Sequence, residues 1–510
     1  MSSLNKRQNP SQSDDEASPS TPKFRQVDDG GLYFVYPPAK RRPPSPPAQD
    51  KKRKDDEYFR DLYASEIDFM ELGKQYPELG LYVQGDRTID FECPAAFMKL
   101  TTTLLKADFG LTVELPDDRL CPPVPNRHNY IIFLKQLLDT STYHPSPPSR
   151  MCHGIDIGTG ASAIYPLLGT TQRPWTFLAT EADEKNVQFA RRNVILNALE
   201  DRIMIVGPRD PTGPLIPFQE PGVKHEEKVH FVTTNPPFYE SEEELVTLAR
   251  QKARPPRSAC TGAPVEMICP GGEVAFVGKI FIESLVWKER IQWYTSMLGK
   301  LESVEKMVKI LTDNDVDNYV VNELVQGKKT KRWVIAWSFG AMRPSHELAS
   351  GIKVVGGKNV APAFAEDQVF EVSESGDLTV GRVLDSVRQT LQELDLLYLK
   401  MQTLSKLPPE HCPIPIVTFE GTGRARENVW NRAWRRKKER GEATVERATS
   451  MPPDGTCAFG FSVVIKASDE EVKVMVKWRE GHNHVMFESF CGFLKRKLAE
   501  SWSEEEINRK

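Results

Sequence analysis

The sequence lacks the patterns of a metal-binding or disulfide-stapled protein. Its eight cysteines are scattered over 510 residues, with no CxxC pair and no cluster of histidine and cysteine, so we expect reduced thiols, no zinc and no disulfides. It has no run of about 18 apolar residues that could cross a membrane, and its N-terminus lacks the apolar segment of a secretory signal. These absences predict a soluble intracellular protein with no membrane partner.

The chain also lacks the net positive charge that is typical of nucleic-acid-binding proteins. Its formal net charge is -4 at pH 7, and an even spread of this charge would argue against a polyanion as partner. The cations are not evenly spread, however. Two basic clusters, at residues 40–42 and 51–54, flank a proline-rich spacer, a layout typical of a bipartite nuclear import signal. This layout predicts that the protein is located in the nucleus, with the cytoplasm as a second location. The alternative is that the two clusters belong to a solvated basic tail that touches RNA phosphates.

Composition divides the chain into four parts. Residues 1–55 are rich in Ser, Pro, Asp, Gln and Lys, a composition that cannot bury enough apolar surface to fold. Residues 56–345 alternate apolar strands with helical periods, as expected of a doubly wound α/β sheet behind a small N-terminal module. Residues 346–365 read as a linker, and residues 366–510 are predicted to form a smaller α+β domain.

Hydrophobic spacing predicts further local elements. Residues 61–76 and 126–139 have helical periodicity, and residues 81–91 read as extended. In the C-terminal part, residues 424–440 are predicted to form one long helix that ends in a basic run.

A strand, a glycine turn and a helix are predicted near the middle of the α/β part. Residues 154–162 read GIDIGTGAS, in which Gly158 and Gly160 permit a tight turn and the start of the following helix favours negative charge. About twenty residues later, a second apolar strand ends at Glu181, which is well placed to accept hydrogen bonds from ribose hydroxyls. The pattern predicts a nucleoside-binding half of the sheet.

The stretch Asn235-Pro236-Pro237-Phe238, called here the NPPF motif, follows an apolar run. Because proline cannot donate to a β ladder, the prolines end the strand and place the motif at its carboxyl end, where α/β sheets bind ligands. The Asn235 side-chain oxygen and the Pro236 carbonyl can hold both hydrogens of an exocyclic amine while Phe238 lies against its ring. This chemistry suits methylation of an amino group, and a plain Asn-Pro turn with a core phenylalanine is the alternative.

The glycine turn alone also fits a nicotinamide-dinucleotide fingerprint, Gly158-x-Gly160-x-x-Ala163. Asp156 favours another cofactor, because a carboxylate two residues before Gly158 would repel a pyrophosphate and attract the ammonium group of a methionine moiety. Together with the NPPF motif at a later strand end, it predicts S-adenosylmethionine as the cofactor.

Three basic segments are candidates for binding RNA phosphates. The first is an irregular loop after the NPPF motif, the second is a hairpin between the last two strands of the α/β part, and the third is the C-terminal basic helix. A solvated charged surface is the alternative for the loop and for the helix. The residues are Arg250, Lys252, Arg254 and Arg257 in the loop, Lys328, Lys329, Lys331 and Arg332 in the hairpin, and Arg435, Arg436 and Lys437 in the helix.

Several of these segments resemble the methyltransferase-like protein 16 family. The resemblance rests on residues 100–139, GIDIGTGASAIYPLLG at 154–169, TEAD at 180–183, NPPF, GGEVAFVGKI at 271–280 and QGKKTKRWVIAWSF at 326–339. It implies a Rossmann-like class I methyltransferase that makes N6-methyladenosine in structured RNA. U6 small nuclear RNA is the implied substrate, and animal members also act on a hairpin in the messenger for S-adenosylmethionine synthetase.

The resemblance also implies roles for single residues. Arg209-Asp210-Pro211 stands where the family has a lysine-containing loop that can obstruct the cofactor pocket, so that lysine is replaced here. The C-terminal part resembles the family's RNA-binding region only in outline, chiefly in WNRAWRRKKER and WREGHN. The implied cofactor contacts are Arg127, Gly158, Ser162, Glu181, Thr212 and Asn235.

Two other functions fit part of the pattern. Asn-Pro-Pro motifs also serve methylation of a glutamine side-chain amide in proteins, although Phe rather than Tyr at 238 and the flanking cations favour a base in RNA. An inactive RNA-binding protein that keeps the sheet as a scaffold is the other possibility. No DNA partner is expected, and the sequence names no protein partner.

Overall fold

The computed structural model describes residues 25–26, 32–33, 54–143, 150–219, 228–244, 247, 262–326, 330–349, 368–372, 377–403, 416–443, 445–468 and 471–508. Several predicted basic residues lie outside these ranges. They are residues 40–42 and 51–53 of the import clusters, Arg250, Lys252, Arg254 and Arg257 of the loop, and Lys328 and Lys329 of the hairpin. Met1–Lys51 and Pro217–Glu226 form a unit of their own, in which β1 (Arg25–Gln26) pairs antiparallel with β2 (Leu32–Tyr33). None of the described helices is long and apolar enough to cross a membrane.

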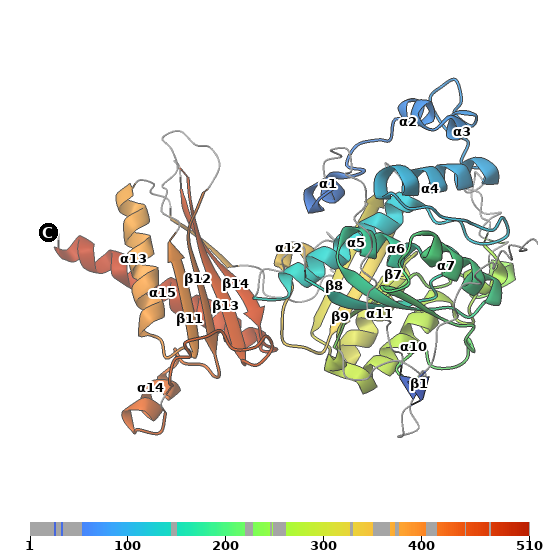
Figure 1. Ribbon diagram of the computed structural model, residues 1–510. Helices are drawn as coiled ribbons and strands as arrows, with labels where there is room; N and C mark the ends of the chain where they lie inside the picture. The colour runs from blue at the N-terminus through green and yellow to red at the C-terminus, as the bar shows by residue number, and fades with distance from the viewer. Residues whose placement is uncertain are drawn as a thin grey trace, which may run out of the picture. The chain divides into compact units, whose positions relative to one another are not determined.

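A seven-stranded sheet organises the α/β part (Figure 1). Its strand order is β5-β4-β3-β6-β7-β9-β8, and neighbours are parallel except where β9 pairs antiparallel with β7 and β8. Chain order reverses between β3 and β6, which is the switch point of a doubly wound sheet. The predicted α/β fold class is confirmed. The strands are β3 (Cys152–Ile157), β4 (Trp175–Thr180), β5 (Ile203–Val206), β6 (Val229–Thr234), β7 (Ile291–Leu298), β8 (Asn318–Gln326) and β9 (Thr330–Ser338).

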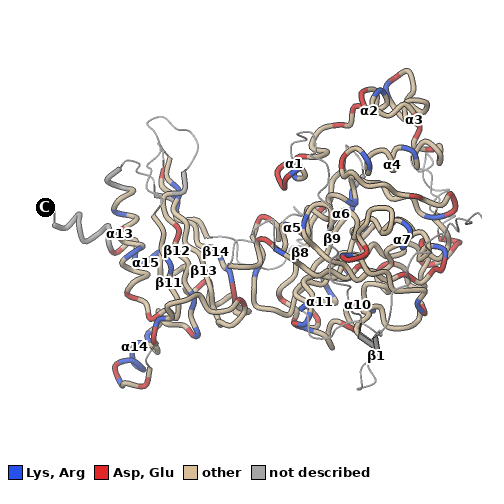
Figure 2. The backbone as a smooth tube through the Cα atoms, in the orientation of Figure 1, with Lys and Arg blue, Asp and Glu red and all other residues tan. Residues whose placement is uncertain are grey.

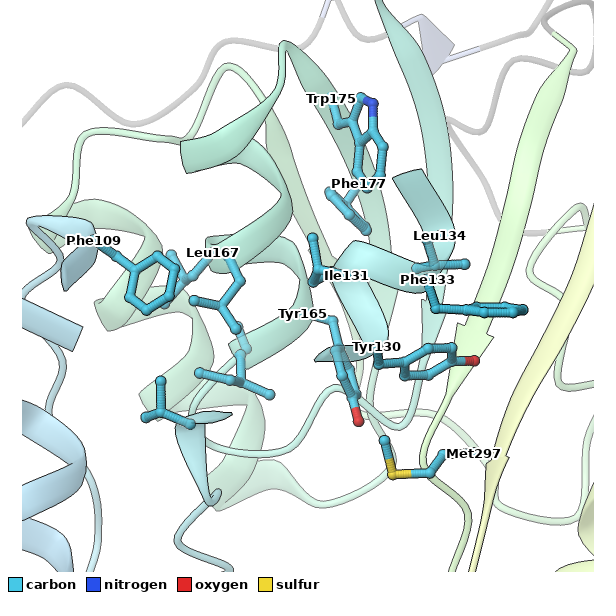
Figure 3. Packing of buried hydrophobic residues seen from close by; sticks show 14 of the residues in the cluster. Phe109, Tyr130, Ile131, Phe133, Leu134, Tyr165, Leu167, Trp175, Phe177 and Met297 are labelled. Carbon is cyan, nitrogen blue, oxygen red and sulfur yellow. The ribbon is translucent and has the colours of Figure 1, made fainter. Parts of the chain in front are cut away.

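Helices cover this sheet on both faces, as a largely parallel sheet requires. α4, α5, α6 and α7 share one hydrophobic core, while α10 and α11 contact each other and β7 (Figure 1). Figure 3 shows Tyr130 and Phe133 of α5 beside Tyr165 of α6 within that core. The helices are α4 (Pro94–Phe109), α5 (Val124–Thr140), α6 (Ile164–Gln172), α7 (Glu184–Leu196), α10 (Gly272–Trp287) and α11 (Leu301–Asp313).

The N-terminal module consists of short helices. The single helix predicted over residues 61–76 is wrong, because Asp68 starts a new helix by accepting hydrogen bonds from two N–H groups of its first turn. The extended segment predicted at 81–91 is reduced to one antiparallel bridge between Val83 and Ile89. The helices are α1 (Asp56–Asp61), α2 (Phe69–Gln75) and α3 (Pro77–Gly80).

Helix α1 docks on the main core through a buried histidine. His128 of α5 is fully buried, its Nε2–H donates to the Phe59 carbonyl at 2.7 Å, and its Nδ1 accepts from Gln172 at 3.3 Å. The contact with Gln172 requires an unprotonated Nδ1, and burial lowers the pKa of His128 to about 4. Asp56 of α1 adds an ion pair of 2.8 Å to Arg173.

We expect the protein to lose stability in mild acid through His128. The pKa of this ring is lower in the folded chain than its ordinary value of 6.5, so its contribution is fully present above pH 6.5 and is lost as the pH falls toward 4. The free energy of unfolding should fall there with a slope that approaches about 1.4 kcal/mol per pH unit. Urea denaturation between pH 7 and pH 4.5 measures this slope. A His128→Gln variant cannot titrate and should lose that share of the slope; equal slopes in both proteins would contradict the assignment.

The α/β part extends past its predicted end at residue 345. α12 (His346–Ala349) places Leu348 and Ala349 in the main hydrophobic core, and Asn322 of β8 donates to the Leu348 carbonyl at 3.1 Å. The linker predicted at residues 346–365 therefore begins no earlier than residue 350.

Residues 368–508 contain a second sheet, in which all neighbouring strands are antiparallel. Its strand order is β10-β14-β13-β12-β11, and α13 contacts β11, β12 and α15. These elements have a hydrophobic core of their own. They are β10 (Gln368–Val372), α13 (Asp377–Glu393), β11 (Tyr398–Thr403), β12 (Ile416–Ala425), α14 (Arg432–Glu439), β13 (Phe459–Ala467), β14 (Val472–Glu480) and α15 (His484–Asn508).

The long helix predicted over residues 424–440 is wrong in its first half. β12 continues through Ala425, and Arg424 is completely buried in an ion pair of 2.7 Å with Glu480 of β14. α14 begins only at Arg432, after the Asn431 side chain has accepted a hydrogen bond from its first turn. The sequence alone places Arg424 on the exposed face of a charged helix, because nothing near it indicates that its ion-pair partner lies 56 residues away.

Candidate active site

The predicted motifs meet at the carboxyl ends of β3 and β6. Asp156 is the penultimate residue of β3, and Asn235 directly follows β6. The Thr234 hydroxyl donates to the Ile157 carbonyl at 2.8 Å and ties the two strand ends together. Ligands of doubly wound sheets bind at such a switch point, so the two motifs border one site.

The glycine turn has the conformation that its sequence predicts. Gly158 and Gly160 have φ angles of +71° and +67°, which residues with a side chain rarely adopt. The Glu181 carboxylate accepts from the Gly160 N–H at 2.8 Å and also from two N–H groups just after β4. Ser162, in the segment that leads into α6, is buried. The turn and the predicted ribose-binding acid are therefore held together at the ends of β3 and β4.

Asp156 is a buried carboxylate that forms no ion pair with the described residues, although the charge of Arg127 favours its ionised form. Its side chain is fully buried, and neither of its carboxylate oxygens has a hydrogen-bond partner among the described residues. Burial raises the pKa of Asp156 to about 7. A buried carboxylate of this kind is stabilised by a cation, and the ammonium group of the predicted cofactor meets that requirement.

Arg127 connects α5 to the NPPF motif. It is 6% exposed, and its Nη1 donates to Asn235 Oδ1 at 3.0 Å and to Met297 Sδ at 3.1 Å. Its guanidinium lies 5.7 Å from the centre of the Tyr165 ring, and Figure 3 shows Tyr165 and Met297 within the same hydrophobic core. Arg127 thus fixes the direction of the Asn235 amide and leaves the second lone pair of Oδ1 for another donor.

Phe238 lies against the backbone just after β7. A Cβ atom added to Gly299 would lie 2.9 Å from Cδ1 of the Phe238 ring. The guanidinium of Arg332 lies 5.7 Å from the centre of the same ring. Pro236 is buried, whereas Asn235 and Phe238 are half-buried, so both functional side chains are partly accessible to a ligand.

Comparison with known proteins identifies the family. The family described as RNA methyltransferase matches residues 51–341. A U6 small nuclear RNA (adenine-(43)-N(6))-methyltransferase of Schizosaccharomyces pombe is 34% identical over 81% of this chain and 96% of its own length. An RNA N(6)-adenosine-methyltransferase mettl16 of Danio rerio is 32% identical over 84% of this chain and 94% of its own length. The chain belongs to the methyltransferase-like protein 16 family.

A solved structure of this family is also similar. The hMettl16 catalytic domain in complex with MAT2A 3'UTR hairpin 1 is 37% identical, with a TM-score of 0.48, and the match covers 54% of this chain and 92% of that one.

The loop after β5 contains Arg209, Asp210 and Pro211, which the family resemblance aligns with a lysine-containing loop. The Arg209 N–H donates to the Glu181 carbonyl at 3.0 Å, so the loop lies next to Glu181, the predicted ribose-binding acid. Thr212 is exposed, its hydroxyl donates to Asp210 at 2.7 Å, and its carbonyl accepts from Lys279 of α10 at 2.9 Å. Within the described residues, Thr212 has no hydrogen bond to the other predicted cofactor contacts.

The described members of the predicted RNA-binding set have different surroundings. Arg332 is half-buried beside the NPPF motif rather than exposed at the tip of a hairpin. Lys331 forms an ion pair of 2.7 Å with a glutamate of β8, and Lys437 one of 3.0 Å with a glutamate that precedes α14. Arg435 and Arg436 are exposed, and Figure 2 shows Lys and Arg gathered along α14. Among the described members of the predicted set, these two arginines are the best placed to meet phosphate.

Sequence reasoning missed two glutamates near the site, of which Glu273 is buried and Glu266 is half-buried. Glu266 of α9 (Pro264–Met267) accepts from the Leu120 N–H at 2.8 Å and from the Asn186 side chain at 3.1 Å. Glu273 of α10 accepts from the two N–H groups that follow β7. The sequence did offer one indication of their role. Both glutamates lie in the first turn of a helix that follows a turn rich in proline or glycine, where a carboxylate often accepts backbone hydrogen bonds.

Proposed function

We propose that this chain is an RNA adenine-N6 methyltransferase that uses S-adenosylmethionine and acts on U6 small nuclear RNA. The observation that carries the proposal is the NPPF motif at the switch point, with Asn235 oriented by Arg127 and the unpartnered Asp156 at the adjoining strand end. We take U6 as the substrate from the name of the Schizosaccharomyces pombe relative. The match covers 96% of that relative and 81% of this chain.

The residues of the site fit this cofactor. Asp156 suits its ammonium group, Arg127 suits its carboxylate, and Glu181 suits its ribose hydroxyls. Gly158 and Gly160 leave open space where a side chain would otherwise project, because nothing lies within 4 Å of a Cβ added to either. When bound, the cofactor supplies an electrophilic methyl group.

The NPPF motif makes the adenine amine a better nucleophile. The N6 lone pair of adenine is delocalised into the ring, which makes the amine unreactive while it stays planar. Asn235 Oδ1 and the Pro236 carbonyl accept its two hydrogens and favour a geometry in which the lone pair points at the methyl donor. Phe238 stacks on the base after it has left its neighbours in the RNA. No general base is required before transfer, because the methylated ammonium product loses a proton to water.

Calorimetry with S-adenosylmethionine tests the enzyme proposal against a non-catalytic RNA-binding scaffold. The proposal expects measurable heat and a single site, whereas a pure scaffold gives none. Methylation of a glutamine side chain is tested by offering a glutamine-containing peptide beside a U6 hairpin, with label expected in the RNA alone.

Cofactor affinity should fall below neutral pH through Asp156. The pKa of this carboxyl is about 7 in the cofactor-free chain, and only the ionised form attracts an ammonium group. Affinity should therefore decline by up to about tenfold per pH unit as the pH falls below 7. Titration calorimetry between pH 6 and pH 8.5 measures it. An Asp156→Asn variant should bind more weakly at every pH and without this pH dependence; a flat profile for the parent chain would contradict the role of Asp156.

We propose that α14 supplies RNA affinity and takes no part in methyl transfer. Arg435 and Arg436 are exposed, and phosphate contacts position a strand without reading its sequence. An Arg435→Gln/Arg436→Gln variant should weaken RNA binding and reduce the slope of log K against log salt by about 1 to 2. Lys437→Gln, which removes an already paired charge, should have a smaller effect. A loss of turnover at saturating RNA with unchanged affinity would contradict this division of roles.

We also propose that the chain enters the nucleus through its two basic clusters, at residues 40–42 and 51–54. The support is the spacing of the clusters in the sequence. A fluorescent protein fused to residues 1–55 should accumulate in nuclei and lose this accumulation when either cluster is replaced by alanine.

A further inference from the structure

A buried glutamate outside the NPPF motif supports the ring on which the target base would stack. We infer that Glu273 is a positioning residue for the acceptor base, acting through Gly299 and the ring of Phe238. This inference rests on the proposed function of the NPPF motif. Glu273 belongs to the Gly271-Gly272-Glu273 turn at the start of α10.

Glu273 fixes the backbone that follows β7. Its side chain is 2% exposed, its Oε2 accepts from the Gly299 N–H at 2.7 Å, and its Oε1 accepts from the Lys300 N–H at 3.1 Å. A buried carboxylate with two N–H donors is held in one orientation and holds the donors in turn. A side chain of α10 therefore fixes the backbone conformation of the connection between β7 and α11.

Gly299 is the surface on which Phe238 rests. A Cβ atom at this position would lie 2.9 Å and 3.1 Å from two ring carbons of Phe238, and 3.3 Å from Glu273 Oε2. The φ angle of Gly299 is outside the left-handed region, so glycine is required here for space rather than for backbone conformation. Any movement of Gly299 is thus passed directly to the ring.

The segment just before the Gly271-Gly272-Glu273 turn holds the chain just beyond Phe238. The Tyr239 N–H donates to the Met267 carbonyl at 3.0 Å, and the Cys269 N–H donates to the Tyr239 carbonyl at 2.9 Å. The Gly272 N–H donates to the Cys269 carbonyl at 2.7 Å, which joins this pairing to the start of α10. Phe238 is therefore constrained from two directions: by Gly299, which Glu273 holds in place, and by the segment that leads from Met267 into α10.

This arrangement gives Glu273 an effect on turnover without contact to either substrate. Reacting groups must be held within about 0.5 Å of a productive geometry, and a displacement of about 1 Å far from the chemistry can cost about 10²-fold in rate. A change at Glu273 or Gly299 should thus lower kcat and leave cofactor and RNA affinities in place, because those come from other residues.

The experiment compares two variants with two matched controls. Glu273→Gln keeps the size of the side chain but offers one acceptor oxygen for two N–H groups, and Gly299→Ala adds the Cβ that meets Phe238. Glu302→Gln removes an exposed carboxylate of α11, and Gly278→Ala adds a Cβ in α10 that meets nothing within 4 Å. With a U6 hairpin, we expect kcat to fall about 10-fold in Glu273→Gln and about 10²-fold in Gly299→Ala. Both controls should stay within twofold of the parent, as should every dissociation constant.

A double-mutant cycle ties the effect to the ring. If Gly299 acts through Phe238, adding Gly299→Ala to Phe238→Ala should cause no further loss of kcat. Fluorescence of 2-aminopurine at the target position gives a readout without turnover, and it should change in Gly299→Ala and Glu273→Gln in the same direction as in Phe238→Ala, because all three changes disturb the stacking of the base on the ring. A full additional loss in the double variant, unchanged fluorescence, or weaker cofactor binding in place of lower kcat would overturn the inference. A parent chain that makes no N6-methyladenosine would overturn the proposed function instead, and the fluorescence comparison would still decide the role of Glu273.

Discussion

Replacing Asn235 by alanine should lower methyl transfer by about 10²-fold or more, the usual cost of losing one preorganised hydrogen-bonding group. The side chain lies at the end of β6 at the switch point, and its Oδ1 already accepts from Arg127 at 3.0 Å. Its second lone pair is the one available to the N6 hydrogen of adenine. Single-turnover kinetics at saturating RNA and cofactor measure the loss.

Two controls make the Asn235 result specific. Cofactor binding by calorimetry and hairpin binding by filter assay should remain near the parent values, because Asp156, Glu181 and phosphate contacts carry them. An Asn235→Ala chain that folds, binds both substrates and still methylates at the parent rate would remove the motif from the mechanism.

Replacing Phe238 by alanine should cause a loss of similar size by a different route. Flipping a base out of its stack costs a few kcal/mol, and stacking on one aromatic ring returns about 1 to 3 kcal/mol. Without the ring, the flipped base is both less populated and less well placed against Asn235. Single-turnover rates should fall about 10²-fold, whereas Phe238→Tyr, which keeps the aromatic face, should retain most of the activity. Equal rates for the alanine and tyrosine variants would show that stacking at this position plays no part.

The central sheet and its site were predictable because their signals are local. A glycine turn after one strand and two prolines after another can be read within a few residues each, and parallel strands bring their carboxyl ends to one edge. The structure places Asp156, Gly158, Gly160, Glu181 and Asn235 along the ends of β3, β4 and β6. Arg127, which only family resemblance suggested, proves to bond Asn235.

The features that sequence reasoning missed depend on partners far along the chain. Arg332 was predicted to be an exposed phosphate contact, but the pairing of β9 with β7 and β8 carries it to the ring of Phe238. Arg424 was assigned to a helix because its buried partner Glu480 lies in another strand. Glu273 gave no chemical signal of its own, since its role depends on two backbone N–H groups that follow β7.

The most direct test of the account is methyl transfer from isotopically labelled S-adenosylmethionine to a U6-derived hairpin, followed by digestion and mass spectrometry of the nucleosides. The account predicts labelled N6-methyladenosine with the parent chain and at most about one hundredth as much with Asn235→Ala. Label in another nucleoside, label in protein, or equal yields from the two chains would contradict it.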